Sequence, residues 1–452
     1  MVMKLRSILD SPCGLRFFVE KLQISSSYSR QVLLDTPFTS TIKEIKENYS
    51  KLQLFYKQFI SEDNFCYTIK NIQEKIAALR DIRGTLTRLE REIVLDDVEL
   101  FEIKSLSLLN EEIRHIFKET CLNVGYLNFY DLSSVVTILD PEGHKINSFY
   151  VYEIYSEELR DIRKRLKKDE PYNEELYYES SLIEEKVRKE LCNKLHPFLD
   201  SLKNTLGILA DLDIIIAKSL QIKELDLVFP TISKGKNIYK GLFNPEVKEL
   251  ISKENRDFQN IDIVIDGYKP LLITGANMGG KSITLKTLAL SQYLFQFSFG
   301  IPANNAEISS VSEILLLTGD HQSITKGLSS FAAEMVKIDT IIKSYRSGKR
   351  ILALIDEPAG TTNPSEGTAL VTALLKILTG MESMAVLTTH YNIDMQECNR
   401  LRVKGYNNGV MDYSLIPGNN MDVPKEALKI ARSLGVDEKW INEAENLVNQ
   451  KQ

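Results

Sequence analysis

The chain has 452 residues, 43% of them apolar and 26% charged, with a formal net charge of −6. This size and balance predict a soluble globular protein of about two or three domains. No apolar run approaches the ~20 residues of a membrane span. The acidic balance argues against a dedicated nucleic-acid binder, which usually carries a basic patch or stripe.

The cysteines indicate a reducing compartment. There are five, scattered along the chain without a C-x-x-C pair. This pattern favours free thiols over a disulfide framework or a zinc site. The first residues lack the apolar core of a signal peptide. We therefore expect a cytoplasmic protein.

Residues 1–235 are predicted to form a mainly helical domain. Apolar residues recur at three-to-four spacing over 41–60 and 67–92, with charges between them. After Pro171 a nearly continuous seam of leucines predicts a long helix that Pro197 kinks. Such a helix suits a lever, although an ordinary bundle core fits the same pattern.

A small β element is expected near residues 134–152. Two apolar runs there flank the turn Asp140-Pro141-Glu142-Gly143, which is typical of a hairpin. The following run Arg160–Lys168 is basic, but acidic residues lie before and after it. We interpret it as a solvated helix face.

From about Lys236 the chain changes to short apolar strands separated by Gly, Pro and Asn. This texture predicts an α/β domain over residues 236–415. Residues 416–452 are assigned to a C-terminal helical segment. Phe258 lies shortly before the next motif and is a candidate for stacking on adenine, with a plain core phenylalanine as the alternative.

An apolar run at 271–273 is followed by a glycine-rich turn and by a helix that opens at Lys281. Such a loop points backbone N–H groups at phosphate oxygens, and the helix N-terminus adds its positive dipole end. Lys281 would bridge the β- and γ-phosphates of ATP, and the Ser282 hydroxyl would hold Mg²⁺. A chance glycine-rich turn is the alternative, which the flanking strand and helix disfavour. The candidate nucleotide contacts are Gly275, Asn277, Met278, Gly279, Gly280, Lys281 and Ser282.

Two further apolar runs end in residues suited to ATP hydrolysis. The run 351–355 is followed by Asp356 and Glu357, as a buried parallel strand would present them at its C-terminal end. Asp356 would hold Mg²⁺, and Glu357 would orient and deprotonate the attacking water. The run 384–389 ends at His390, placed to sense the γ-phosphate. A lone histidine is usually structural, but this position favours a catalytic role beside Lys281 and Glu357.

The segment 326–335 (KGLSSFAAEM) places a glycine and two serines at the start of an amphipathic helix. This is a second anion-binding helix N-terminus. Because one subunit already has a phosphate cradle, Ser329 and Ser330 suggest a site completed across a dimer. A simple N-cap is the alternative.

Together these segments resemble the MutS family of ATPases. The stretch TGANMGGKS at 274–282 nearly reproduces the family's TGPNMGGKS, GLSSFAAEM at 327–335 is similar to GRSTFxxEM, and TTHY at 388–391 matches ATHY. Residues 423–444 resemble the family's C-terminal dimerisation helices. The resemblance implies an α/β P-loop ABC-type ATPase domain preceded by a mainly helical lever domain, with ATP and Mg²⁺ as cofactors.

The chain departs from mismatch-repair members in several places. We expect no mismatch-reading domain, because the lever-like pattern begins almost at Met1, and no C-terminal nuclease domain. The loop 358–367 (PAGTTNPSEG) stands where those members have IGRGTSTYDG. In this loop the chain is similar to the MutS-like subunit of the reactivase for adenosylcobalamin-dependent lysine 5,6-aminomutase.

The resemblance leaves three functions to compare. The first is a homodimeric ATPase, with or without a companion subunit, that moves its levers to remodel a protein client such as a cobalamin-dependent aminomutase. The second is a DNA-binding homologue acting on mismatched or branched DNA in repair. The third is an ATP-dependent scaffold, which Glu357 argues against because a binding module needs no water-activating carboxylate. The acidic charge favours the first over the second.

Overall fold

The computed structural model divides the chain into two compact units. We call Met1–Leu22, Thr36–Ser50 and Gln221–Gln452 the α/β unit, and Gln23–Asp35 with Lys51–Leu220 the helical unit. None of the helices in the described part of the chain has the length and apolar character needed to span a bilayer. The structure describes residues 3–60, 65–120, 125–168, 173–275, 279–318, 330–380, 382–407, 410–418, 428, 431–432 and 435–450.

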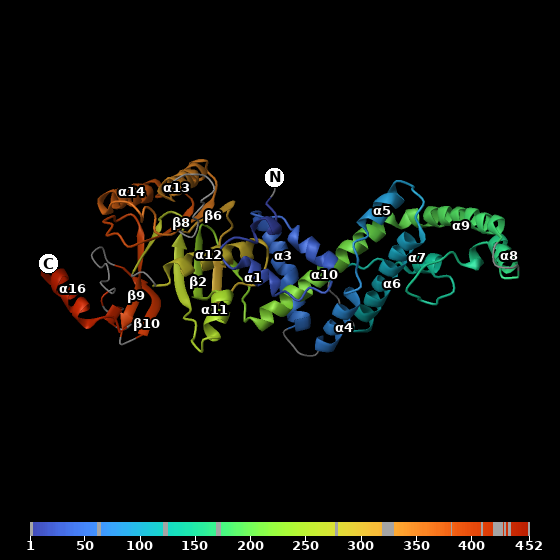
Figure 1. Ribbon diagram of the computed structural model, residues 1–452, viewed down its shortest axis with the longest axis horizontal. Coiled ribbons are helices and arrows are strands. Elements are labelled where there is room, and N and C mark those ends of the chain that lie inside the picture. Colours follow the sequence, from blue (N-terminus) through green and yellow to red (C-terminus); the bar gives the residue numbers. More distant parts are fainter. Residues whose placement is uncertain are drawn as a thin grey trace. The chain divides into compact units, whose positions relative to one another are not determined.

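Amphipathic helices build the helical unit around one apolar core (Figure 1). Helix α6 lies entirely within this unit and begins with a capping box, in which the Asp96 and Glu99 side chains each accept a hydrogen bond from the other's backbone N–H. The break predicted at Pro197 is confirmed, since a short 3₁₀ turn separates α9 from α10. The unit contains α2 (Ser27–Leu34), α4 (Cys66–Ile76), α5 (Arg83–Glu90), α6 (Asp97–Glu119), α7 (Ser133–Leu139), α8 (Glu157–Leu166) and α9 (Glu174–Leu195), and its boundaries fall within α3 (Ile42–Phe55) and α10 (Leu199–Glu224).

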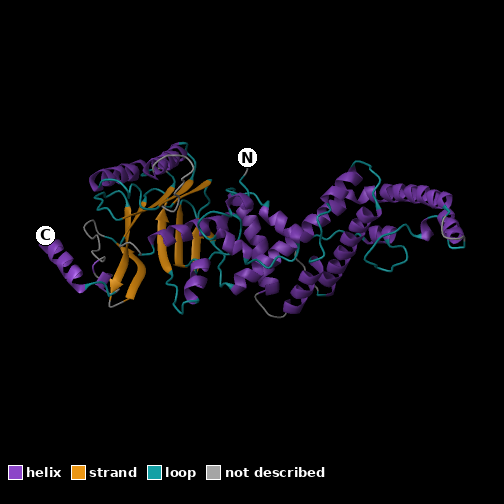
Figure 2. Cartoon of the chain, in the orientation of Figure 1, coloured by secondary structure: helices purple, strands orange, loops and turns teal. Residues whose placement is uncertain are grey.

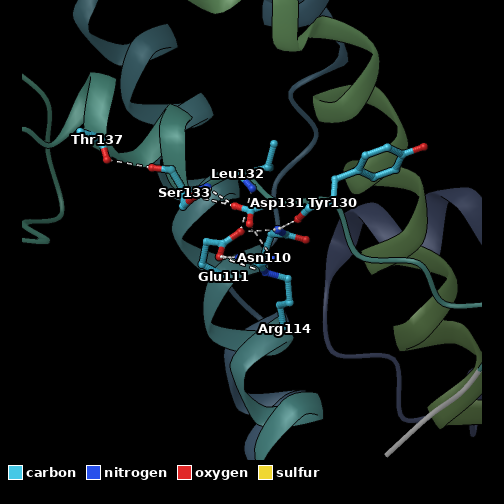
Figure 3. Close-up of polar contacts among 8 residues, drawn as sticks. All are labelled: Asn110, Glu111, Arg114, Tyr130, Asp131, Leu132, Ser133 and Thr137. Atoms are coloured by element: carbon cyan, nitrogen blue, oxygen red, sulfur yellow. Dashed lines mark hydrogen bonds and ion pairs between the residues drawn. The ribbon is translucent and has the colours of Figure 1, made fainter.

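The prediction of a small β element near residues 134–152 is wrong. Ser133–Leu139 forms helix α7, and the described residues 148–152 belong to no strand. Asp131, which lies just before the N-cap residue Leu132, accepts hydrogen bonds from the Ser133 N–H at 3.0 Å and from the Ser133 hydroxyl (Figure 3). The apolar run is short, so its spacing suits a strand or a helix equally. The turn at Asp131 and the packing of α7 on α6 favour the helix.

A sealed polar cluster follows α7. The Lys104 ammonium lies 3.2 Å from Asp140 Oδ1, 3.2 Å from Tyr152 Oη and 3.4 Å from the Ser148 carbonyl. The Lys145 N–H donates to the second Asp140 oxygen at 2.8 Å. Burial raises the pKa of Asp140, but the hydrogen bonds from Lys145 and Lys104 outweigh it and hold that pKa below its ordinary value. We call Lys104, Asp140 and Tyr152 the sealed cluster.

The α/β texture predicted from Lys236 is confirmed. Figure 2 shows the strands gathered in this unit. The six-stranded sheet has the order β10-β9-β4-β8-β7-β6, all parallel except β10. Its strands are β4 (Leu271–Thr274), β6 (Glu313–Leu317), β7 (Ile351–Ile355), β8 (Met384–Thr389), β9 (Asn399–Asn407) and β10 (Val410–Pro417). The four-stranded sheet β1-β5-β2-β3 contains β1 (Thr231–Ile232), β2 (Lys236–Leu242), β3 (Ile261–Asp266) and β5 (Asn305–Ile308).

Helices cover the larger sheet. Apolar residues of α13 and α14 share one core with inward side chains of β4, β7 and β8, so these two helices lie along the same face (Figure 1). Every residue of β7 is buried, which explains why its sequence is a continuous apolar run. The helices of this unit are α1 (Leu15–Glu20), α11 (Pro245–Ser252), α12 (Lys281–Gln296), α13 (Ser330–Arg346), α14 (Pro364–Ile377) and α16 (Glu438–Gln450).

The division into units differs from the expected boundary at residue 235. Residues 1–22 and 36–50 group with the α/β unit. Aromatic contacts hold them there: the Phe18 and Phe299 rings lie 5.7 Å apart, and Tyr49 Oη donates to the Phe299 carbonyl at 2.8 Å. These contacts join residues about 250 positions apart, so local periodicity does not reveal them.

Candidate active site

The carboxyl ends of β4, β6, β7 and β8 meet at one edge of the parallel sheet, where ligands bind in open α/β folds. A cavity of about 730 Å³ opens there. Its walls come from the loop before α12, the ends of β6 and β7, the helix α13 and the hairpin strand β10. Among its lining residues are Gly279, Gly280, Lys281, Ser282, Asp356 and Glu357.

The glycine-rich turn has the backbone that a phosphate loop needs. Gly275 has φ +150° and Gly280, which caps α12, has φ +75°, conformations that favour glycine. A Cβ on Gly275 would lie 3.0 Å from Val403, so the loop also passes close to β9. The buried Lys281 ammonium donates to the Gly275 carbonyl at 2.7 Å. Asn277 and Met278 lie outside the described residues.

The two carboxylates predicted after β7 lie beside this lysine. Lys281 Nζ is 3.1 Å from Glu357 Oε1. Asp356 Oδ1 accepts from the Thr388 hydroxyl at 2.6 Å, and the same hydroxyl accepts from the Glu357 N–H at 2.9 Å. Thr388 therefore fixes both acidic residues from the neighbouring strand. We call Lys281, Asp356 and Glu357 the open cluster.

The backbone is strained where the open cluster ends. Glu357 has φ +43° and Ala359 has φ +59°, although neither is glycine. Left-handed conformations of such residues cost about 1–3 kcal/mol each and concentrate at functional sites. The strain is thus an independent indication of function at Glu357.

His390 is half-exposed at the end of β8, with Nδ1 3.9 Å from Glu357 Oε2. Its ring centroid is 4.4 Å from that of Tyr391. It lies near the Glu357 carboxylate but is not among the residues lining the cavity. Of the two predicted serines, Ser329 lies outside the described residues, and Ser330 is the first residue of α13.

Phe258 is half-buried and lines the cavity, as its predicted role requires. A second aromatic ring, that of Tyr413 on β10, lines the same cavity and was not predicted. Gln259 holds this strand in place: Nε2 donates to Asp412 at 2.8 Å, and Oε1 accepts from the Tyr413 N–H at 2.8 Å. Because about 150 residues separate Gln259 from Tyr413, no local sequence motif predicts the position of Tyr413.

The residues present fit a nucleoside triphosphate with Mg²⁺. Glycines with positive φ leave room for phosphate oxygens, and a buried lysine faces them. Ser282 and Asp356 supply a hydroxyl and a carboxylate oxygen at the cavity wall, the hard donors that Mg²⁺ prefers beside phosphate. The two aromatic rings suit a base.

Comparison with known proteins points to one family. Residues 271–450 match the family model described as MutS domain V. The chain is 29% identical over 391 residues to a protein of Pediococcus pentosaceus named "Endonuclease MutS2", covering 82% of this chain and 46% of the relative. Proteins of the same name from Carboxydothermus hydrogenoformans and Ligilactobacillus salivarius are 32% and 35% identical, over 60% and 46% of this chain and 35% and 26% of their own lengths.

The chain thus spans less than half the length of these curated relatives. The matched region begins at β4 and contains the glycine-rich loop, the open cluster and His390. These matches support membership of the MutS family, with residues 271–450 similar to its domain V.

Proposed function

We propose that this chain is a MutS-type ATPase of the P-loop ABC class, which binds ATP·Mg²⁺ in the cavity and hydrolyses it. The observation that carries the proposal is the meeting of Lys281, Asp356 and Glu357 at the mouth of a glycine-rich loop. The match to MutS domain V supports it independently.

Each residue of the open cluster has a distinct role. Lys281, now paired with Glu357 at 3.1 Å, exchanges this partner for the β- and γ-phosphates of ATP. Glu357 is then free to take a proton from the attacking water. The water oxygen bonds to the γ-phosphorus as the bond from that phosphorus to ADP breaks and ADP leaves. Ser282 and Asp356 would hold Mg²⁺, which would neutralise charge at the phosphates. His390, 3.9 Å from Glu357, orients toward the γ-phosphate.

The apolar part of the cavity takes the base. Phe258 and Tyr413 line it together with Leu242, Val247 and Ile261. We assign the two aromatic residues to stacking on adenine. Steady-state phosphate release by the wild-type protein tests the function directly: we expect Mg²⁺-dependent ATP hydrolysis, and a protein that neither binds nor hydrolyses ATP would contradict the proposal.

We further propose that ATP closes a homodimer. The α13 N-terminus at Ser329 and Ser330 would cap the γ-phosphate of the opposing subunit. The C-terminal helix α16 exposes Trp440 and Leu447, seven residues apart, as an apolar face suited to association. Sedimentation of a Glu357→Gln variant should show dimers with ATP·Mg²⁺; a strictly monomeric protein at saturating ATP would contradict the completion of the site across a dimer.

For the object of this ATPase we propose a protein client, remodelled by lever movement, in the manner of the aminomutase reactivase. The net charge of −6 and the divergent loop 358–367 favour this. The alternative is DNA, favoured by the printed name of the relatives, "Endonuclease MutS2". Stimulation of ATP hydrolysis by a co-purifying protein, but not by duplex or branched DNA at ~150 mM salt, would support the client; the reverse would support DNA.

A further inference from the structure

The loop that follows the open cluster is held on both sides at one residue, Ala359. Its N–H donates to Glu334 Oε1 on α13 at 3.0 Å. Its carbonyl accepts from the Tyr391 hydroxyl, just beyond β8, at 2.7 Å. Ala359 is itself buried. Side chains from two separate elements therefore satisfy both backbone polar groups of this residue.

These bonds act on the strained segment. Ala359 and Glu357 both have positive φ, and the Gly360 N–H closes a turn onto the Glu357 carbonyl at 3.1 Å. Such a conformation persists only when its surroundings over-determine it. Without the two external bonds, the loop would relax toward ordinary φ values and carry the Glu357 carboxylate with it.

Tyr391 fits against the next helix only because of Gly367. This glycine lies within α14, and a Cβ built on it would overlap the Tyr391 hydroxyl. Since its helical backbone does not itself require glycine, the requirement is space. The Tyr391 N–H also donates to the Thr389 hydroxyl at 3.0 Å, which fixes the chain on the other side of the ring.

Glu334 faces both the loop and the cavity. It lies one turn inside α13 and is among the residues that line the cavity. Burial raises the pKa of Glu334, against the hydrogen bond from Ala359, which lowers it. A half-buried carboxylate that accepts a backbone N–H at the cavity wall connects α13 to the segment carrying the catalytic base.

We infer that Glu334 and Tyr391 are positioning residues, which clamp Ala359 and thereby hold Glu357 in place for attack by water. The inference rests on the proposed ATPase function. The clamp connects Glu357 to three elements, α13, α14 and the end of β8. A displacement of α13 would therefore reach Glu357 through the hydrogen bond between Glu334 and the Ala359 N–H.

The test compares the variants Glu334→Ala, Tyr391→Phe and Gly367→Ala with the wild-type protein. Each removes or displaces one arm of the clamp. We expect kcat to fall roughly 10- to 100-fold, because misplacing a catalytic group by about 1 Å can cost ~10²-fold. The KM for ATP should change less than about twofold, because no phosphate contact is lost. Glu334→Gln keeps an acceptor oxygen and should retain most of the activity.

Tyr345→Phe is the matched control. The Tyr345 hydroxyl also donates to a buried carbonyl, that of Leu378, in the same unit but outside the cavity lining. This variant should keep its kcat. Hydrogen exchange gives a second readout: the Ala359 amide should exchange faster in Glu334→Ala than in Glu334→Gln.

Wild-type kcat in folded Tyr391→Phe and Glu334→Ala, with unchanged exchange at Ala359, would overturn the clamp. A Tyr345→Phe loss equal to that of Tyr391→Phe would do the same, because the effect would then be general to buried tyrosines. A wild-type protein without ATP hydrolysis would instead refute the proposed function, so the two failures are distinguishable.

Discussion

Two lysine–carboxylate clusters in this protein have nearly the same pair distance and opposite surroundings. In the sealed cluster, Lys104 and Asp140 are 3.2 Å apart with both side chains 0% exposed. In the open cluster, Lys281 and Glu357 are 3.1 Å apart, but Glu357 is 33% exposed. The first has a partner for each carboxylate oxygen, whereas the second borders a cavity. A non-glycine residue with positive φ lies beside each cluster, Lys145 beside the first and Ala359 beside the second.

The difference separates a structural ion pair from one built for exchange. A sealed pair contributes to stability as long as both partners remain, because either charge alone would be buried without compensation. When an ion pair at a cavity separates, its carboxylate can be hydrated. The lysine of such a pair is therefore available to phosphate oxygens. The distance between the charges does not distinguish the two pairs; the burial of the carboxylate and the adjoining cavity do.

Lys104→Ala should have the largest effect on stability. It leaves the Asp140 carboxylate buried without its cation, which typically costs about 3–5 kcal/mol. Urea unfolding of the full-length protein measures this, and the double variant Lys104→Met/Asp140→Asn should recover most of the loss. A Lys104→Ala cost below about 1 kcal/mol would show that the cluster is not sealed in solution.

Lys281→Ala should have the opposite profile. Its free energy of unfolding should stay within about 1 kcal/mol of the wild-type value, because Glu357 keeps access to water. ATP affinity should fall at least ~100-fold, since charge-assisted hydrogen bonds contribute about 1.5–3 kcal/mol each. Calorimetric titration with ATP·Mg²⁺ checks this. Unchanged affinity would remove the lysine from the phosphate site.

The aromatic residues should matter less than the lysine. Phe258→Ala and Tyr413→Ala should each weaken ATP binding by roughly 5- to 100-fold, the scale of about 1–3 kcal/mol for base stacking. Inorganic triphosphate should bind both variants as it binds the wild type. Tyr268→Ala is the control, because Tyr268 is an exposed tyrosine of the same unit outside the cavity. Equal losses in all three variants would reject stacking.

Asp131→Asn should lower the free energy of unfolding by the smallest amount, and only at pH values above about 4. Hydrogen bonds from Ser133, with a further contribution from Arg114, lower the pKa of Asp131 from 3.8 to about 2. A lowered pKa means that the contribution is present above pH ~4 and is lost as the pH falls toward 2. Because the side chain is exposed, we expect less than about 1 kcal/mol at pH 6. Urea unfolding should show the difference between the two proteins shrinking below pH 4 and disappearing only near pH 2, and a constant difference would contradict the assignment.

The sequence predicted the open cluster well because its parts are local. An apolar strand followed by a glycine-rich turn, and another followed by Asp356-Glu357, each carry their own signal, and parallel strands bring their ends together. The prediction failed at Ser133–Leu139, where seven residues are too few to separate a helix from a strand by spacing.

Other site features depend on contacts between distant parts of the chain. Tyr413 reaches the cavity through the pairing of β10 with β9 and through Gln259. Glu334 shows its role only once Ala359 is found beside it with φ +59°. Neither residue has a neighbouring sequence pattern that specifies such a partner, because the partner lies in a distant part of the chain.

The most direct test of the open cluster is a paired measurement on Glu357→Gln: ATP binding at equilibrium and ATP turnover in the same preparation. The substitution preserves the size of the side chain and removes its ability to take a proton. We predict wild-type or tighter ATP affinity with turnover reduced at least ~100-fold, the scale of general-base catalysis. Undiminished hydrolysis would contradict the account, because Glu357 would then not be the base and the strained loop would have another purpose.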